Sequence, residues 1–203
     1  MKAYFYGDSN TYGYDPRGIM GGRYPEEYRW PDILMGMFPE WTIVSDGMNG
    51  RCIPADDRSF QFLEKDLLKE APINAFAVML GTNDLLNQWE PDTYEIESNM
   101  ETFCGKVSEV FKEQAEPADC YIITPPKLML GGSDGDKYNA EMSVLCDKYT
   151  KLAEKVGWKF IDTRGVELSM AFDGIHLTEN GHKALAKVFA EQIFEGRDKS
   201  YER

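Results

Sequence analysis

The sequence has no long apolar run. Among its 203 residues no segment approaches the roughly 18 uninterrupted apolar residues that a membrane-spanning helix requires. The opening segment, MKAYFYGDSN, also lacks the apolar stretch of about 7–15 residues that marks a signal peptide. We therefore expect a cytoplasmic protein that does not bind membranes.

Basic residues are also scarce. The chain has 22 Lys and Arg against 35 Asp and Glu, a formal net charge of −13. This charge repels phosphate backbones and anionic lipid, so binding to nucleic acid is not expected. We interpret the acidic surplus as a surface that keeps the protein soluble.

Metal-binding residues are few and scattered. There are two histidines, and the four cysteines form no CxxC pair or other metal-ligand spacing: Cys52, Cys104, Cys120 and Cys146. The sequence predicts reduced thiols, no metal site and no other cofactor.

What the sequence does have is an alternation of short apolar runs with amphipathic stretches. We predict strands over residues 3–6, 42–45, 75–80, 120–124 and 159–162. The segments between them carry apolar side chains at helical spacing. The alternation predicts an α/β fold, a three-layer α/β/α sandwich with a mainly five-stranded parallel sheet, in one domain over residues 1–203.

Ligands of such sheets bind outside the carboxyl ends of the strands, so the loops after the first four strands should form the site. The first loop contains GDSNTYG at 7–13. This run either cradles a phosphate, as in flavodoxin-like binding modules, or presents Ser9 as a nucleophile. No GxSxG motif surrounds Ser9, which excludes the α/β-hydrolase form of a serine site.

The segment DGIHL at 173–177 favours the nucleophile. Asp173 lies three residues before His176, so its carboxylate can accept the Nδ1–H of the imidazole. The Nε2 atom is then free to take the proton of a serine hydroxyl. The other histidine, His182, lies within the amphipathic C-terminal helix and is interpreted as structural.

Four motifs in order resemble those of the SGNH (GDSL-type) hydrolase family: GDSNTYG, DGMNGR at 46–51, GTND at 81–84 and DGIHL. RYP at 23–25 and RWP at 29–31 resemble the bacterial arylesterase and acetylesterase branch. The resemblance implies the flavodoxin-like SGNH fold and a serine esterase.

The resemblance also assigns residues to roles. It places the nucleophile at Ser9, the base at His176 and the orienting acid at Asp173. The oxyanion hole would be formed by the backbone N–H groups of Ser9 and Gly50 and by the Asn83 side chain. The sequence alone permits either Gly47 or Gly50 as the backbone donor after the second strand. With the donor at Gly50, as the resemblance implies, Gly47 is expected to serve the turn that leaves the strand, with a positive φ.

Several further residues are predicted near the site. Asp8 and Asp84 are expected to accept backbone N–H groups and hold their loops rigid. Asn10 stands where the family usually has leucine or isoleucine, and we expect it to line the acyl side of a substrate pocket. The other predicted pocket residues are Tyr12, Tyr14, Trp89 and Ile175, whereas Trp30 should begin the first long helix and pack inward.

The resemblance implies that the substrate is a small carboxylic ester with a short acyl group, acetyl above all. Arylesterase relatives often form homo-oligomers, so a homo-oligomer is a further expectation. One alternative is a thioesterase or lysophospholipase, for which the polar run at 127–136 looks unsuited because a long acyl chain needs an apolar groove. The other is a non-catalytic flavodoxin-like binding module, which would have no need of Asp173 beside His176.

Overall fold

A five-stranded parallel sheet forms the centre of the computed structural model, which describes residues 1–18 and 22–195. The strands are β1 (Lys2–Gly7), β4 (Thr42–Gly47), β5 (Ala75–Met79), β6 (Asp119–Ile123) and β7 (Lys159–Ile161), in the order β4-β1-β5-β6-β7. All four neighbouring pairs are parallel. The predicted fold class is confirmed, and each predicted strand matches to within two residues at either end.

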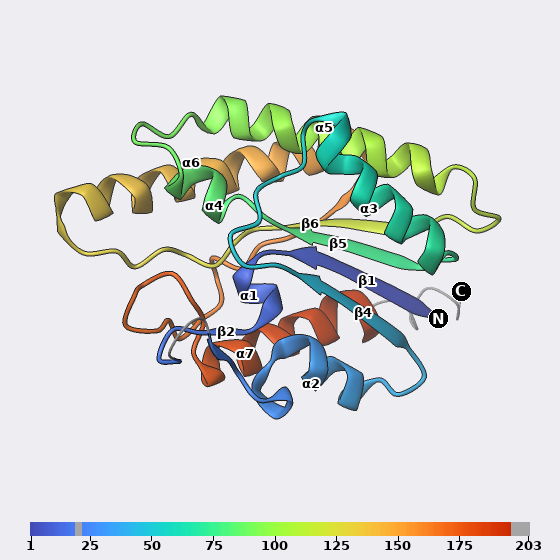
Figure 1. The fold of residues 1–203 in the computed structure, drawn as a ribbon, viewed down its shortest axis with the longest axis horizontal. Helices are drawn as coiled ribbons and strands as arrows, with labels where there is room; N and C mark the ends of the chain where they lie inside the picture. Colours follow the sequence, from blue (N-terminus) through green and yellow to red (C-terminus); the bar gives the residue numbers. More distant parts are fainter. Residues whose placement is uncertain (19–21, 196–203) are drawn as a thin grey trace.

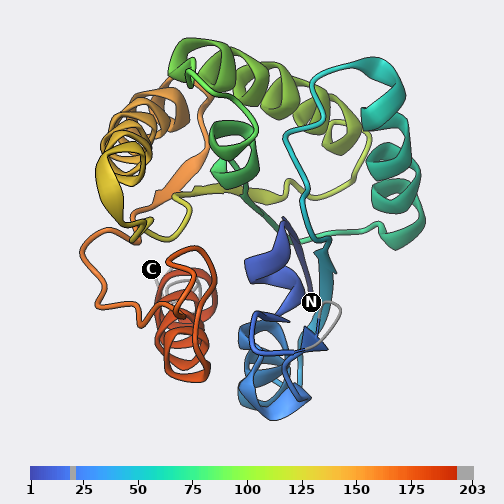
Figure 2. The same cartoon turned by 60° about the vertical axis from the view of Figure 1, so that its left-hand side comes forward.

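Helices cover both faces of the sheet. They are α1 (Ser9–Tyr12), α2 (Trp30–Met37), α3 (Asp57–Glu70), α4 (Thr82–Leu86), α5 (Thr93–Phe111), α6 (Gly132–Val156) and α7 (Glu179–Phe189), with a 3-10 turn at Glu26–Tyr28 and a π-helical turn at Ala190–Glu195. Figures 1 and 2 show α3, α5 and α6 on one face and α2 and α7 on the other. The short antiparallel pair β2 (Tyr14–Asp15) and β3 (Gly22–Arg23) was not predicted.

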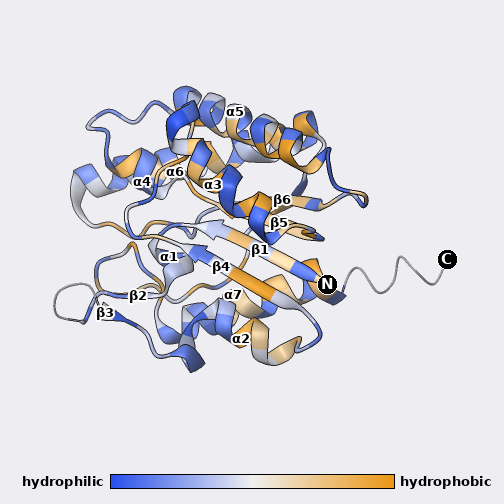
Figure 3. Cartoon of the chain, turned by 45° about the vertical axis from the view of Figure 1, so that its right-hand side comes forward, coloured by the Kyte–Doolittle hydropathy of each residue, from blue (hydrophilic) through white to orange (hydrophobic). Residues whose placement is uncertain are grey.

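Each face of the sheet has its own apolar core. Alternate side chains of a strand point to opposite faces, so β1 contributes Tyr4 to the core under α3, α5 and α6 and Phe5 to the core under α2 and α7. Trp30 begins α2 as predicted, is 1% exposed and meets the Phe5 ring edge-on at 4.9 Å. In Figure 3 the helices alternate between orange and blue, as expected for helices with one buried face.

The helix α6 begins earlier than the sequence suggested. The polar run at 127–136 was interpreted without helical structure, but α6 starts at Gly132. The side chain of Asn139 reaches back to the chain before the helix, where it accepts from the Leu130 N–H at 3.2 Å and donates to the Leu130 carbonyl at 3.0 Å. These bonds fix the entry to a glycine-rich first turn that reads as a loop in the sequence.

The helices of the described chain, residues 1–18 and 22–195, include none with the length and apolar character needed to cross a bilayer.

Candidate active site

Ser9 is the first residue of α1, directly after β1, where Figure 1 shows α1 at the carboxyl end of the strand. Asp8 caps this short helix, because its carboxylate accepts the Asn10 N–H at 2.9 Å. Gly13, at φ +84°, ends the helix in the left-handed conformation that glycine tolerates best. Ser9 is therefore held at the sheet edge by a cap on either side.

The structure brings Ser9, His176 and Asp173 together. The Ser9 Oγ lies 2.9 Å from the His176 Nε2, and the His176 Nδ1 lies 2.6 Å from the Asp173 Oδ2. The second carboxylate oxygen, Oδ1, accepts the backbone N–H groups of Ile175 and His176 at 3.0 and 3.1 Å. One carboxylate thus orients both the imidazole ring and the turn that carries it.

Asp173 is held in its charged form. Burial alone would raise the pKa of this carboxyl, but the hydrogen bonds from the His176 ring and from the backbone of Ile175 and His176 outweigh burial and lower the pKa below its ordinary value. Asp173 is consequently an ionised acceptor for the imidazole N–H at neutral pH.

Asn83 and Gly50, the predicted oxyanion donors, lie on neighbouring segments. Asn83 is half-buried in the first turn of α4, and its side-chain amide donates to the Arg51 carbonyl at 3.0 Å. Gly50 is exposed in the adjoining turn with φ +74°, and a Cβ built there would meet no atom within 4 Å. The amide of Asn83 has two N–H groups, so the bond to Arg51 leaves one for a ligand.

Gly47 differs from its prediction. It lies within β4, pairs with Gly7 and is not among the glycines with positive φ. A Cβ at this position would come within 2.2 Å of the Tyr12 backbone nitrogen. Gly47 is required because the backbone of α1 approaches it closely, and this approach is not visible in the sequence.

Arg51 is a positioning residue that sequence reasoning did not single out. Its guanidinium donates to the Gly7 carbonyl at 3.0 Å, pairs with the Asp46 carboxylate at 2.6 Å and lies 4.0 Å from the centre of the Tyr6 ring. It therefore ties the loop after β4 to the end of β1. The only signal in the sequence is a basic residue within a predicted site loop of an acidic chain.

Asn10 also differs from its prediction. It is 1% exposed, and its side-chain amide is bonded to the backbone of Ile175 and Leu177. Its side-chain amide is therefore not free to line an acyl pocket. Because both its nitrogen and its oxygen are bonded, this buried amide helps to hold the backbone around the site in place.

The other predicted pocket residues differ in their contacts and in their exposure to solvent. The Tyr14 ring is centred 4.5 Å from the His176 ring, whereas Tyr12 lies under the guanidinium of Arg23 at 4.4 Å. Ile175 is half-buried beside His176. Trp89 is 77% exposed. Of the aromatic candidates, Tyr14 is the one that contacts the proposed triad.

Two buried carboxyl groups flank the site. The Asp8 cap has its pKa raised by burial to about 7. Asp84 accepts the Ile53 N–H at 3.1 Å, and burial raises its pKa to about 6. Both accept a backbone N–H as predicted. The second histidine, His182, is fully buried in α7, and burial lowers its pKa to about 4, so its ring is neutral at pH 7.

Comparison with protein families identifies the class. Residues 5–184 match the model of the GDSL-like lipase/acylhydrolase family. The match spans most of the chain, so the chain belongs to this family, as the four motifs predicted. Family membership makes the protein a hydrolase of carboxylic esters. Among curated protein sequences none matches the chain at a significant level.

Several solved structures with the same fold are named as esterases. A protein of Agrobacterium tumefaciens C58 named as an arylesterase is 27% identical, with a TM-score of 0.83 over 96% of this chain and 98% of the other. The aryl esterase of M. smegmatis is 22% identical, with a TM-score of 0.82 over 95% and 97%. Est24, a carbohydrate acetylesterase from Sinorhizobium meliloti, is also 22% identical, with a TM-score of 0.78 over 95% and 97%.

Proposed function

We propose that the protein hydrolyses short-chain carboxylic esters, acetyl esters above all, through an acyl-enzyme on Ser9. The observation that carries the proposal is the continuous line of contacts from the Ser9 hydroxyl through the His176 ring to the Asp173 carboxylate. A serine hydroxyl is a weak nucleophile by itself and needs an adjacent base whose orientation is fixed by a third group. We further propose that the chain acts as a single domain, without a cofactor.

In the acylation step the Ser9 Oγ attacks the ester carbonyl carbon while its proton passes to the His176 Nε2. The carbonyl oxygen becomes an oxyanion, which the N–H groups of Ser9 and Gly50 and the free amide N–H of Asn83 would stabilise. Collapse of this intermediate breaks the bond to the alcohol oxygen. His176 returns the proton to the departing alcohol.

Deacylation repeats these reaction steps with water as the nucleophile. The water gives its proton to His176, attacks the acyl carbon and forms a second oxyanion at the same place. The bond to Ser9 then breaks, the carboxylic acid leaves and Ser9 regains its proton from His176. Throughout the cycle the ionised Asp173 accepts the Nδ1–H and stabilises the positive charge that His176 carries after each transfer.

The residues around His176 favour a substrate with a short acyl group. The Met129 N–H donates to the Gly174 carbonyl at 2.8 Å, so the segment before α6 lies beside the turn that carries His176. Gly131, at the end of this segment, and residues 132–134 in the first turn of α6 are exposed and polar or glycine. A long acyl chain would need an apolar groove, because each unburied methylene forgoes up to about 0.8 kcal/mol. The acetylesterase names of structural neighbours point in the same direction.

The test is the hydrolysis of p-nitrophenyl esters from C2 to C12 by the wild type and by Ser9→Ala. We expect acetate and propionate to give the highest kcat/KM, and Ser9→Ala to lose about 10⁴-fold or more in kcat with an unchanged circular dichroism spectrum. Ser98→Ala, an exposed serine on α5, is the matched control and should behave as the wild type. Undiminished activity in Ser9→Ala would refute the mechanism, and a preference for octanoate would indicate a thioesterase or lysophospholipase.

A further inference from the structure

The side chain of Asn10 forms hydrogen bonds with the backbone on both sides of His176. Its Nδ2 donates to the Ile175 carbonyl at 3.1 Å, and its Oδ1 accepts the Leu177 N–H at 2.9 Å. A primary amide has a donor and an acceptor in one plane, so a single side chain can replace the pair of bonds that a neighbouring strand would make. The residue between the two bonded groups is His176 itself.

These two bonds connect the proposed base to the helix of the proposed nucleophile. The other backbone bonds of the turn run to different places: the His176 carbonyl accepts from Ala171, and the Gly174 carbonyl accepts from Met129. Among the hydrogen bonds of residues 1–18 and 22–195, the Asn10 pair is what joins the backbone of residues 175–177 to α1. Asn10 directly follows Ser9, so the connection spans 167 positions of sequence at the place where Ser9 and His176 meet.

Asn10 is itself held from the opposite side. The indole Nε1 of Trp30, at the start of α2, donates to the Asn10 carbonyl at 2.9 Å. Asn10 and Trp30 are each 1% exposed, so neither side chain has room to turn away. The backbone of Asn10 is thus fixed by the α2 layer while its side chain fixes the turn that carries the imidazole.

We propose that Asn10 is a positioning residue, which keeps the His176 ring in place beside the Ser9 hydroxyl. The inference rests on the proposed function, because it concerns the base of that same reaction. Asn10 does not touch the reacting atoms. It acts through the backbone of residues 175–177, which sets the distance between the His176 Nε2 and the Ser9 Oγ. A displacement of about 1 Å between reacting groups costs on the order of 10²-fold in rate.

The test replaces Asn10 with leucine, which has a similar size and the family's usual character at this position. Asn10→Leu removes both bonds and leaves the Ile175 carbonyl and the Leu177 N–H without their partner. We expect kcat for p-nitrophenyl acetate to fall about 10²-fold while KM stays within about twofold, because the loss concerns the transition state and not substrate binding. We also expect Ser9 to react more slowly with a sulfonyl fluoride.

A spectroscopic measurement separates positioning from general destabilisation. The proton between the His176 Nδ1 and the Asp173 Oδ2 should give a strongly deshielded NMR resonance in the wild type, because the bond is short at 2.6 Å. We expect this resonance to broaden or disappear in Asn10→Leu. If that variant does not fold, Asn10→Ser serves instead, since its hydroxyl is too short to span both backbone groups.

Thr11→Val is the matched control. Thr11 is the next residue of α1 and is also 1% exposed, and its hydroxyl has no hydrogen-bond partner within the described part of the chain. This variant should keep the wild-type kcat and resonance. The inference is overturned if Asn10→Leu keeps both, if its loss lies in KM, or if Thr11→Val loses as much. Should Ser9→Ala also remain active, the proposed function fails as well, and an inactive Ser9→Ala leaves that function standing.

Discussion

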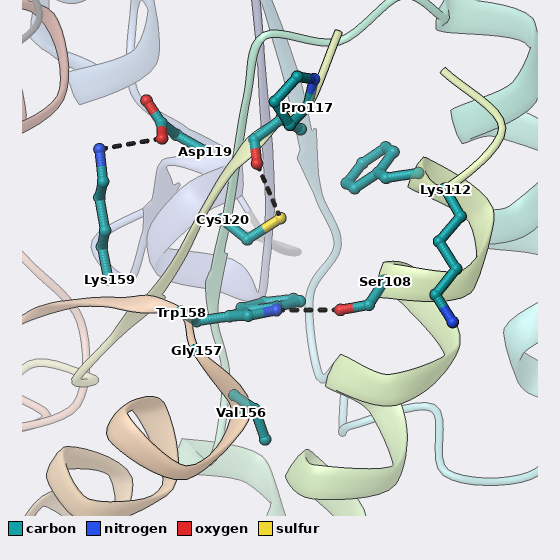
Figure 4. A pocket seen from close by; sticks show the side chains of 11 residues that line it. Ser108, Lys112, Pro117, Asp119, Cys120, Val156, Gly157, Trp158 and Lys159 are labelled. Carbon is teal, nitrogen blue, oxygen red and sulfur yellow. Dashed lines mark hydrogen bonds and ion pairs between the residues drawn. The ribbon is translucent and has the colours of Figure 1, made fainter. Parts of the chain in front are cut away.

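The two edges of the sheet differ in how their polar side chains are arranged. At the amino end of β6 and β7 lies an open pocket of about 340 Å³, shown in Figure 4. Two pairs of its polar side chains are bonded to each other: the Trp158 Nε1 donates to the Ser108 Oγ at 3.1 Å, and Lys159 pairs with Asp119 at 3.0 Å. These polar groups of the pocket are thus bonded in separate pairs.

At the carboxyl edge the polar side chains are buried and converge. Asp8, Ser9, Asn10 and Thr82 are each no more than 6% exposed. Burying polar groups costs free energy unless they are bonded, and the side chains of Asp8, Ser9 and Asn10 are each bonded. The proposed site thus lies where buried polar groups converge, whereas the polar groups of the amino-edge pocket are bonded in separate pairs. Three predictions test this contrast.

The largest effect concerns Asn83, the side-chain donor of the proposed oxyanion hole. Asn83→Ala deletes the free amide N–H together with the bond to the Arg51 carbonyl. We expect kcat to fall about 10²–10³-fold, or roughly 2.7–4 kcal/mol, because such a donor stabilises the oxyanion more than the ground state. Steady-state kinetics with p-nitrophenyl acetate measure the change.

Asn87→Ala is its matched control. Asn87 is the residue after α4 and is exposed, and among the bonds of the described chain its side chain donates only to the Cys52 Sγ at 3.3 Å. We expect an undiminished kcat in this variant. Equal losses in the two variants would show that α4 supports the site as a whole and that Asn83 has no separate role.

The fold and the proposed triad were predictable because their signals are local. The run at 75–79 is buried throughout, as a strand covered on both faces must be, and its apolar character is continuous in the sequence. The pairing of Asp173 with His176 follows from a spacing of three residues on one turn. Neither inference needs knowledge of distant contacts.

Asn10 and Gly47 were misjudged because their roles depend on distant contacts. A polar residue beside a nucleophile can face substrate or backbone, and the choice for Asn10 is decided by residues 175–177. The need for glycine at position 47 is decided by the backbone of Tyr12. Sequence patterns report periodicity and composition, but they do not report which segments meet across the sheet edge.

A second prediction concerns the pH dependence of stability at the carboxyl edge. Burial raises the pKa of Asp8 to about 7 and that of Asp84 to about 6, so the folded protein binds these protons more tightly than the unfolded chain does. The stabilisation is complete below the ordinary aspartate pKa near ~3.9 and is lost as pH rises through about 6 to 7. The free energy of unfolding should therefore decline over this window.

Two cap variants isolate this effect in urea unfolding between pH 5 and pH 8. Asp8→Asn keeps a capping oxygen but removes one titrating group, and we expect a shallower decline than in the wild type. Asp56 caps the exposed start of α3, and its bonds to Ser59 lower its pKa, so its contribution is lost only at lower pH. Asp56→Asn should keep the wild-type slope. The prediction fails if Asp8→Asn keeps that slope too.

The smallest effect is expected at the amino edge. Lys159 pairs with Asp119 at 3.0 Å beside the pocket of Figure 4, but the lysine side chain is 55% exposed. Solvent screens such a pair, and its removal typically costs about 0–1 kcal/mol. Lys159→Ala should therefore lower the melting temperature slightly and leave kcat and KM for p-nitrophenyl acetate unchanged. A tenfold loss in kcat would show that the amino edge influences the site across the full length of the strands, and the contrast between the two edges would then no longer hold.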